Sequence, residues 1–406
     1  METMDYSLLS DEELLALEKK LKNEATRYNT MQMAQKILLN SLYGALGATS
    51  FRYYDLDLAV SVTSSGRHAI KWIERKLNEL VDKKVGVSKD RVVLIDTDSV
   101  VIDLSDFIEK NCPKDSTREQ RLTYLDMFAE RILSPYIEHS YQELHEYMNS
   151  FEQRMRMKRE NIINAMVSVA SKAYVMEVYN SEGVQYTLKD PKMKIMGLQL
   201  VKSSMPQVVR SVLRNALPIM LHGTESDIQE YVSEFTNKYK NYSVAEIAFP
   251  RGVNDISKFR TETVKAKIKK LTERGSSLTD EEQTEKMRLY NVLENEHPIY
   301  TKGTPIHVKG SLVYNDLIDK FGLRQQRKRI VDGDKIKFVY LKKYNPFHEE
   351  CIAFQGDLPP EFGLDNFIDY DKMIEKTFYS AMEIMVKPLG WDIHKKFNLD
   401  DFFNYG

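Results

Sequence analysis

Cysteine is scarce in this 406-residue chain, which contains only Cys112 and Cys351. Two cysteines so far apart exclude a disulfide-rich scaffold and a cysteine-based zinc site. Long apolar runs are also missing, since none approaches the roughly 18 residues that a membrane-spanning helix needs. The acidic opening, Met1 to Asp5, is unlike a signal peptide. These absences predict a soluble cytoplasmic protein that has no membrane partner.

An excess of one charge is missing as well. The 58 Lys and Arg residues and the 60 Asp and Glu residues leave a net charge of -2. This balance excludes a uniformly basic nucleic-acid coat but allows a basic face. Basic residues concentrate in residues 251 to 274 and 327 to 343. Each stretch is open to two interpretations, a nucleic-acid contact or an ordinary solvated surface.

The most informative motif that is present places two carboxylates in one turn. Asp96-Thr97-Asp98-Ser99 lies between the apolar runs 92 to 95 and 100 to 102. These runs predict two buried strands joined as a β-hairpin. Two aspartates at one tip crowd like charges and supply the oxygen ligands that Mg²⁺ prefers. The motif therefore predicts a metal site for phosphate chemistry, although taken alone it also fits an ordinary polar turn.

A second motif lies on a predicted helix. The capping-box spacing of Ser10 to Glu13 and the leucines that follow predict a long helix ending near Gly44. One face of this helix carries Lys36, Asn40, Tyr43 and Gly44. A lysine neutralises phosphate, a ring packs on a sugar or base, and glycine leaves room beside them. This face suits a nucleotide, and the alternative is an ordinary helix with a glycine cap.

The remaining periodicity predicts both helices and antiparallel strands. Amphipathic helices are expected around residues 70 to 80 and 125 to 148, the latter interrupted at Pro135. A second hairpin is expected between strands 174 to 178 and 184 to 187. Beyond about residue 204, charged helices dominate. The chain is therefore expected to be α+β, with a second domain beginning near that position.

Both motifs resemble signatures of family B DNA polymerases. Residues 36 to 44 are similar to the family's K-x-x-x-N-S-x-Y-G motif, and residues 96 to 99 are similar to D-T-D-S, in the same order. Residues 51 to 56, 72 to 76 and 194 to 198 resemble the replicative polymerases of T-even-type bacteriophages. The resemblance runs from about residue 10 to the C-terminus. A phage protein of this kind would act in the host cytoplasm.

The resemblance implies a polymerase shaped like a right hand. An antiparallel palm sheet with flanking helices would be preceded by a long fingers helix and followed by a mainly helical thumb. The C-terminal half of the fingers would occupy residues 1–48, the palm 49–200 and the thumb 201–390. Residues 391–406 would form a tail, and residues 261 to 298 look like an insertion of charged helices that has no assigned function.

The resemblance also implies two-metal nucleotidyl transfer to a primer 3′-hydroxyl. Asp98 would bind both Mg²⁺ ions and Asp96 would lie beside it at the same site. Seven further residues would contact the substrates: Lys36, Asn40, Tyr43 and Gly44 for the incoming dNTP and the nascent base pair, and Lys172, Tyr174 and Lys202 for primer-template DNA. Ser171 to Tyr174 resembles a degenerate form of the family's K-K-R-Y motif, and Lys202 would donate to acceptors in the minor groove.

Departures from the family pattern keep two alternatives open. Leu94 and Ile95 stand where family members have Tyr-Gly. A DNA-binding or assembly subunit without catalysis is therefore the second interpretation. An unrelated Mg²⁺ nuclease is the third, and it would make the resemblance of residues 36 to 44 a coincidence.

The resemblance further implies two protein partners. The family's first metal-binding aspartate, in an S-L-Y-P-S-like motif, and its exonuclease carboxylates have no counterpart in the sequence. We therefore expect the C-terminal subunit or fragment of a split polymerase, which is inactive without an N-terminal polypeptide. The apolar tail from Phe397 to Tyr405 resembles a sliding-clamp-binding peptide, and packing onto the thumb is its alternative.

Overall fold

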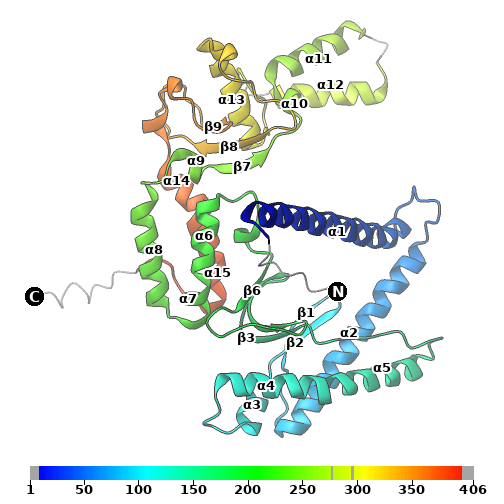
Figure 1. Ribbon diagram of the computed structural model, residues 1–406. Helices are drawn as coiled ribbons and strands as arrows, with labels where there is room; N and C mark the ends of the chain where they lie inside the picture. The colour runs from blue at the N-terminus through cyan, green and yellow to red at the C-terminus, as the bar shows by residue number, and fades with distance from the viewer. Residues whose placement is uncertain (1–8, 276–277, 294–296, 396–406) are drawn as a thin grey trace, which may run out of the picture. The chain divides into compact units, whose positions relative to one another are not determined.

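The computed structural model describes residues 9–275, 278–293 and 297–395. Its backbone forms two compact units, Met1–Arg159 and Glu160–Gly406. The expected α+β class is confirmed, because helices are combined with antiparallel sheets in the described part of the chain (Figure 1). The bounds expected for fingers, palm and thumb stay predictions. No helix among the described residues is long and apolar enough to cross a membrane.

The first unit opens with one long helix, α1, Asp11–Leu46. The predicted capping box is confirmed: the Ser10 hydroxyl accepts the Glu13 N–H at 3.4 Å, and the Glu13 carboxylate accepts the Ser10 N–H at 2.9 Å. The helix continues unbroken through Gly44 and is capped by Gly47. None of its side chains is buried, so its outer surface stays open to solvent along the whole length.

The core of the first unit forms around α2, Leu56–Val85. Ile73 and Leu77 are buried against the helices that follow, as their spacing predicts, and Val81 is buried with them. The Trp72 indole N–H donates to the Ser140 carbonyl at 2.8 Å. Four further helical segments complete this core: α3, Ser105–Asn111; α4, Arg118–Phe128; the π-helical η2, Ala129–Leu133; and α5, Ser134–Met148.

Pro135 interrupts this helical region less than expected. We expected α4 and α5 to be separated there, but the π-helical turn η2 joins them directly. Proline falls in the first turn of α5, where its missing N–H is not needed. The wider π-helical turn η2 therefore takes the place of the expected break between α4 and α5.

The second unit begins with a four-stranded antiparallel sheet. Its strands are β3, Asn161–Ala170; β4, Ala173–Ser181; β5, Val184–Gln185; and β6, Lys192–Met196. The predicted hairpin corresponds to β4 and the short β5. Sequence reasoning missed β3, although it forms the longest pairing with β4. Irregular register in β3 interrupts the alternation that identifies a strand.

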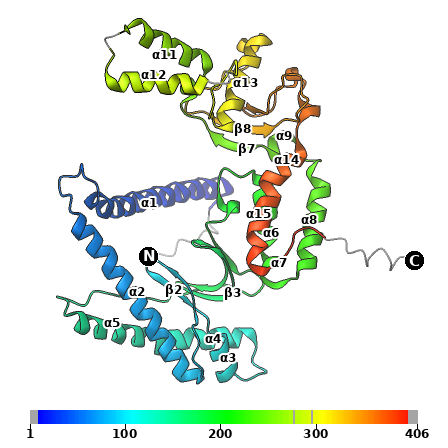
Figure 2. The same ribbon diagram turned by 180° about the vertical axis from the view of Figure 1, so that it is seen from behind.

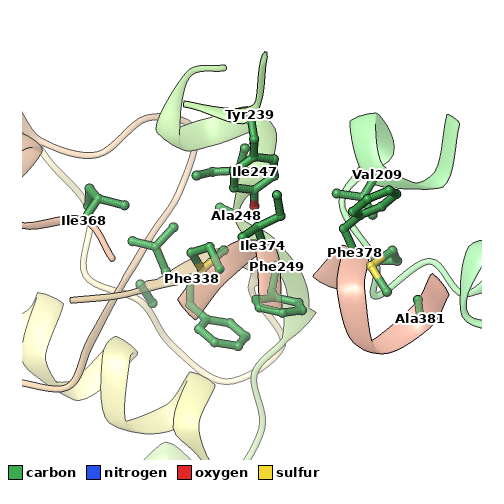
Figure 3. Close-up of a cluster of buried hydrophobic side chains, with 14 of the residues drawn as sticks. Val209, Tyr239, Ile247, Ala248, Phe249, Phe338, Ile368, Ile374, Phe378 and Ala381 are labelled. Carbon is green, nitrogen blue, oxygen red and sulfur yellow. The ribbon is translucent and has the colours of Figure 1, made fainter. Parts of the chain in front are cut away.

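A second sheet of three antiparallel strands lies within the region expected to be mainly helical. It comprises β7, Phe249–Gly252; β8, Lys335–Tyr340; and β9, Cys351–Phe354. Because β7 and β8 come from segments about 80 residues apart, local periodicity gives no sign that they pair. Figure 3 shows Phe249 and Phe338 within the buried cluster, with ring centroids 5.0 Å apart.

Helices cover both sheets of the second unit. Figures 1 and 2 show α6, α8 and α15 as neighbours, and the Phe235 and Phe378 rings meet there at 4.5 Å. The helices are α6, Gln207–Asn215; α7, Leu217–His222; α8, Glu225–Tyr239; α9, Val244–Ile247; α10, Ile256–Phe259; α11, Thr261–Glu273; α12, Asp280–Leu293; α13, Ile306–Lys320; α14, Tyr370–Ile374; and α15, Ser380–Val386. Short turns are η3, Gln199–Val201; η5, Leu323–Gln325; η6, Pro360–Phe362; η7, Asp365–Phe367; η8, Glu375–Tyr379; and η9, Lys387–Leu389.

One buried carboxylate makes the stability of this unit depend on pH. Glu349 is 7% exposed, and burial raises its pKa to about 7. Its carboxylate accepts the Tyr300 hydroxyl at 3.3 Å and lies 3.4 Å from the His297 ring. The folded state therefore keeps a proton on Glu349 at pH values where the unfolded carboxyl has already lost it. This group destabilises the fold as pH rises from about 5 to about 8.

Glu349→Gln is expected to remove this pH dependence. The free energy of unfolding of the wild type should fall by roughly 2–4 kcal/mol between about pH 5 and pH 8 relative to the variant. Urea denaturation at the two pH values measures the difference. Glu350→Gln is the control, because Glu350 is exposed and its ion pairs with Lys309 and Lys372 are 3.6 and 3.5 Å long. Parallel profiles for wild type and Glu349→Gln would contradict the prediction.

Candidate functional site

The two aspartates lie at the tip of the predicted hairpin. Its strands are β1, Val92–Asp96, and β2, Ser99–Ile102, and Asp96 pairs with Ser99. The strands were expected to be buried, which is wrong: Val93 is 54% and Ile95 36% exposed. The alternate residues Leu94 and Asp96 are only partly exposed. A two-stranded ribbon next to α2 buries one of its faces more than the other. Because successive side chains of a strand point to opposite faces, the exposure of the residues alternates along β1.

The turn between the strands is unusually tight. Thr97 has φ 59°, in the left-handed region that favours glycine, and the Asp98 N–H donates to the Asp96 carbonyl at 2.7 Å. The Thr97 hydroxyl donates to Asp96 Oδ1 at 3.2 Å, and the Ser99 hydroxyl donates to the Asp96 carbonyl at the same distance. A threonine in this region costs about 1–2 kcal/mol. The turn therefore fixes Asp96 and places the exposed Asp98 immediately beside it.

A buried arginine anchors the base of this hairpin. Arg91 is 1% exposed, and its guanidinium pairs with Asp82 of α2 and, at 3.4 Å, with Asp106 of α3. Its backbone N–H donates to Asn78 Oδ1 at 2.9 Å, and its carbonyl accepts the Asp103 N–H at 2.8 Å. Both strands are thereby tied to α2 and α3. Sequence reasoning missed Arg91 because its acidic partners lie 9 and 15 residues away in a generally charged stretch.

The second predicted group lies on the last turns of α1. Successive helical residues are about 100° apart, so Lys36, Asn40 and Tyr43 fall within about 60° of one another. All three are exposed, and the Tyr43 hydroxyl reaches the Ala59 carbonyl on α2 at 3.4 Å. Nothing within 4 Å would meet a side chain at Gly44. The structure thus keeps these four residues accessible on one helix of the first unit.

The residues predicted to contact DNA lie in the second unit. Lys172 occupies the β3–β4 turn with φ 60°, and the Tyr174 ring that follows is buried at 6% exposure. Gly197, with φ 66°, approaches this turn so closely that a Cβ there would lie 2.1 Å from the Lys172 carbonyl oxygen. Lys202 is exposed just after η3, and its N–H donates to the Gln199 carbonyl at 3.0 Å. Sequence reasoning missed the contact at Gly197.

The carboxylate pair has suitable chemistry for Mg²⁺. This ion typically binds through one or two carboxylates, several waters and substrate phosphates. Asp96 and Asp98 supply two such carboxylates at an exposed tip. Within the described ranges, no three His, Cys, Asp or Glu side chains gather closely enough to hold a metal ion. Asp96 and Asp98 therefore fit Mg²⁺ as two ligands that need further ligands beside them, such as water or substrate phosphate.

Comparison with known proteins identifies the family. Residues 12–114 match the model of DNA polymerase family B, and this range includes the α1 face and the Asp96–Asp98 tip. The chain is 30% identical over 98% of its length to a DNA-directed DNA polymerase of Enterobacteria phage T4, and 32% identical over 93% to that of Escherichia phage RB69. The chain belongs to DNA polymerase family B.

The family relationship extends beyond phages, although the chain is shorter than its relatives. DNA polymerase 1 of Saccharolobus solfataricus is 24% identical over 98% of the chain. The chain spans 41% of the phage T4 relative and 39% of the phage RB69 relative. Similarity therefore covers nearly all of this chain but less than half of either phage polymerase.

Proposed function

We propose that this chain carries the nucleotide-transfer site of a DNA-directed DNA polymerase, with primer-template DNA and dNTPs as substrates. The observation that carries the proposal is the pairing of two motifs within the family-matched residues 12–114: an accessible Lys-Asn-Tyr-Gly face on α1 and two adjacent carboxylates on β1–β2. The first suits a triphosphate and the second suits the metals that accompany it.

In this mechanism Asp98 would bind both Mg²⁺ ions, and Asp96 would lie beside it at the same site. When bound, the metals would activate the primer 3′-hydroxyl and stabilise charge on the departing pyrophosphate. The protein's part is to keep the carboxylates where the ions are needed. The tight Thr97 turn and the Arg91 anchor limit the freedom of the tip, which supports this positioning role.

The remaining predicted residues position the substrates. Lys36 would neutralise the triphosphate, Asn40 would donate a hydrogen bond to it, and Tyr43 with Gly44 would border the nascent base pair. Lys172 and Tyr174, on the turn and strand that Gly197 approaches, would lie near the primer end. Lys202 would contact the minor groove, where acceptors common to all base pairs allow a contact of low sequence preference.

The proposal that a second polypeptide binds this chain rests on the side of α1 that faces away from Lys36. Leu38 is 72% and Leu42 58% exposed, and they lie about 200° and 240° around the helix from Lys36. Exposed Tyr28 and Met31, about 280° and 220° around the helix from Lys36, extend this stripe toward the N-terminus. An apolar stripe of this length suits a second helix. We expect it to come from an N-terminal polypeptide that also supplies the missing metal ligand and the exonuclease.

A sliding clamp is the other proposed partner. The peptide expected to bind it, from Phe397 to Tyr405, lies outside the residues that the structure describes. Deleting the residues after Lys396 tests the clamp proposal separately from the polymerase proposal. Processivity in the presence of the clamp should fall, whereas primer extension in the absence of the clamp should stay the same.

Primer extension tests the function and the partner requirement together. The chain is assayed alone and after mixing with a polypeptide that carries the S-L-Y-P-S-like motif, both with Mg²⁺ and all four dNTPs. Extension is expected only in the mixture, because the proposal assigns one metal-binding aspartate to the N-terminal polypeptide. Robust extension by the chain alone would contradict the partner requirement. Failure of the mixture despite stable association of the two polypeptides would contradict the polymerase assignment.

A further inference from the structure

The loop that carries Lys202 is a short turn between η3 and α6. The Lys202 N–H donates to the Gln199 carbonyl at 3.0 Å, and the Met205 N–H donates to the Lys202 carbonyl at 3.1 Å. Lys202 and Ser203 are exposed, whereas Met205 is only 5% exposed. The buried Met205 therefore fixes the end of the turn, and the part that carries the Lys202 side chain lies at the surface.

Arg251 holds this turn from another part of the chain. It lies on β7, 47 residues after Ser204, and its Nη1 donates to the Ser204 carbonyl at 2.7 Å. The same nitrogen donates to the Pro250 carbonyl at 3.1 Å. One guanidinium group thus joins the turn to a strand of the three-stranded sheet, and both belong to the second unit.

The surroundings of Arg251 keep its guanidinium in place. Its Cζ lies 5.7 Å from the centroid of the Phe249 ring, which stacks on the Phe338 ring. Arg251 is half-buried, and burial lowers its pKa, although arginine stays protonated at neutral pH. A hydrogen bond from a partly desolvated cation is stronger than one in water. The bond to the Ser204 carbonyl is therefore suited to resisting movement of the turn.

We propose that Arg251 is a positioning residue for primer-template DNA, because it holds the turn from which Lys202 reaches the minor groove. Only Ser203 separates Lys202 from Ser204, so a displaced Ser204 carbonyl also displaces the Lys202 backbone, and small misplacements of a contact group are costly. The inference rests on the DNA contact proposed for Lys202. It gives Arg251, the first residue of the basic stretch 251 to 274, a role other than direct contact with phosphate.

Hydrogen exchange tests the hold on the turn in the absence of DNA. Arg251→Met removes the donors and keeps an unbranched side chain. The Lys202 and Met205 amides should exchange about tenfold faster in this variant of the full chain, whereas amides of α8 should not change. Arg251→Lys keeps a donor and should restore part of the protection. Wild-type exchange in Arg251→Met would overturn the proposal, and so would faster exchange throughout the second unit.

A double-mutant cycle tests the effect on DNA binding. Fluorescence anisotropy gives the Kd of the full 406-residue chain for a primer-template duplex. Lys202→Ala should raise this Kd about tenfold, because a hydrogen bond from a charged donor is lost. Arg251→Met should raise it about threefold to tenfold. The double variant should match Lys202→Ala alone, because Arg251 acts through Lys202.

A matched variant controls for the lost charge. Arg288 lies on α12 with its side chain 69% exposed and 3.5 Å from Glu285, and Arg288→Met should keep the wild-type Kd. If Arg251→Met weakened binding equally with and without Lys202, the two residues would act independently and the positioning role would be wrong. Unchanged binding by Lys202→Ala would contradict the DNA contact in the proposed function itself, and the role of Arg251 in DNA binding would fall with it.

Discussion

Asp98→Ala is expected to reduce nucleotide incorporation by the reconstituted polymerase by about a thousandfold or more. Two-metal sites contribute several kcal/mol to transition-state stabilisation, and each 1.4 kcal/mol corresponds to about a factor of ten. Asp98 lies exposed beside Asp96 on the fixed β1–β2 tip, so no neighbouring movement is expected to replace it. Single-nucleotide incorporation under rapid-quench conditions measures the rate.

The control must distinguish lost chemistry from lost folding or DNA binding. Asp115→Ala changes another exposed aspartate of the first unit and should leave the rate unchanged. Asp98→Ala itself should bind primer-template DNA at least as well as the wild type, because it removes a negative charge near phosphate. Unchanged incorporation by Asp98→Ala would favour the alternative of a DNA-binding or assembly subunit without catalysis.

Local patterns in the sequence predicted most of the first unit. The capping box at Ser10, the apolar spacing of α2 and the hairpin around Asp96 all depend on contacts between near neighbours. The three-stranded sheet of the second unit could not be predicted this way. Its β7 pairs with β8 about 80 residues later, and only tertiary packing brings such segments together.

The same distinction holds for the candidate site. Asp96, Asp98 and Lys36 were identifiable because their motifs are continuous in sequence. Arg91 and Gly197 were not, because their importance arises from partners elsewhere in the chain. Gly197 contacts the turn at Lys172, and a single glycine after a short strand carries no sequence signal of such an approach.

Gly197→Ala is the second large effect that we expect. Its φ of 66° would place alanine in the left-handed region, at a cost of about 1–2 kcal/mol. The added Cβ would also lie 2.1 Å from the Lys172 carbonyl oxygen, so the β3–β4 turn must move. The free energy of unfolding of the second unit should fall by about 3 kcal/mol or more. Chemical denaturation followed by a probe in this unit measures it.

Gly183→Ala separates these two contributions. Gly183 has φ 88°, and nothing lies within 4 Å of a Cβ built on it. This variant should therefore show only the conformational cost, about 1–2 kcal/mol. Because the displaced turn carries Lys172, Gly197→Ala should also raise the KM for primer-template DNA, whereas Gly183→Ala should not. Equal losses of stability in the two variants would mean that the turn yields to the added methyl group, and the positioning role of Gly197 would be wrong.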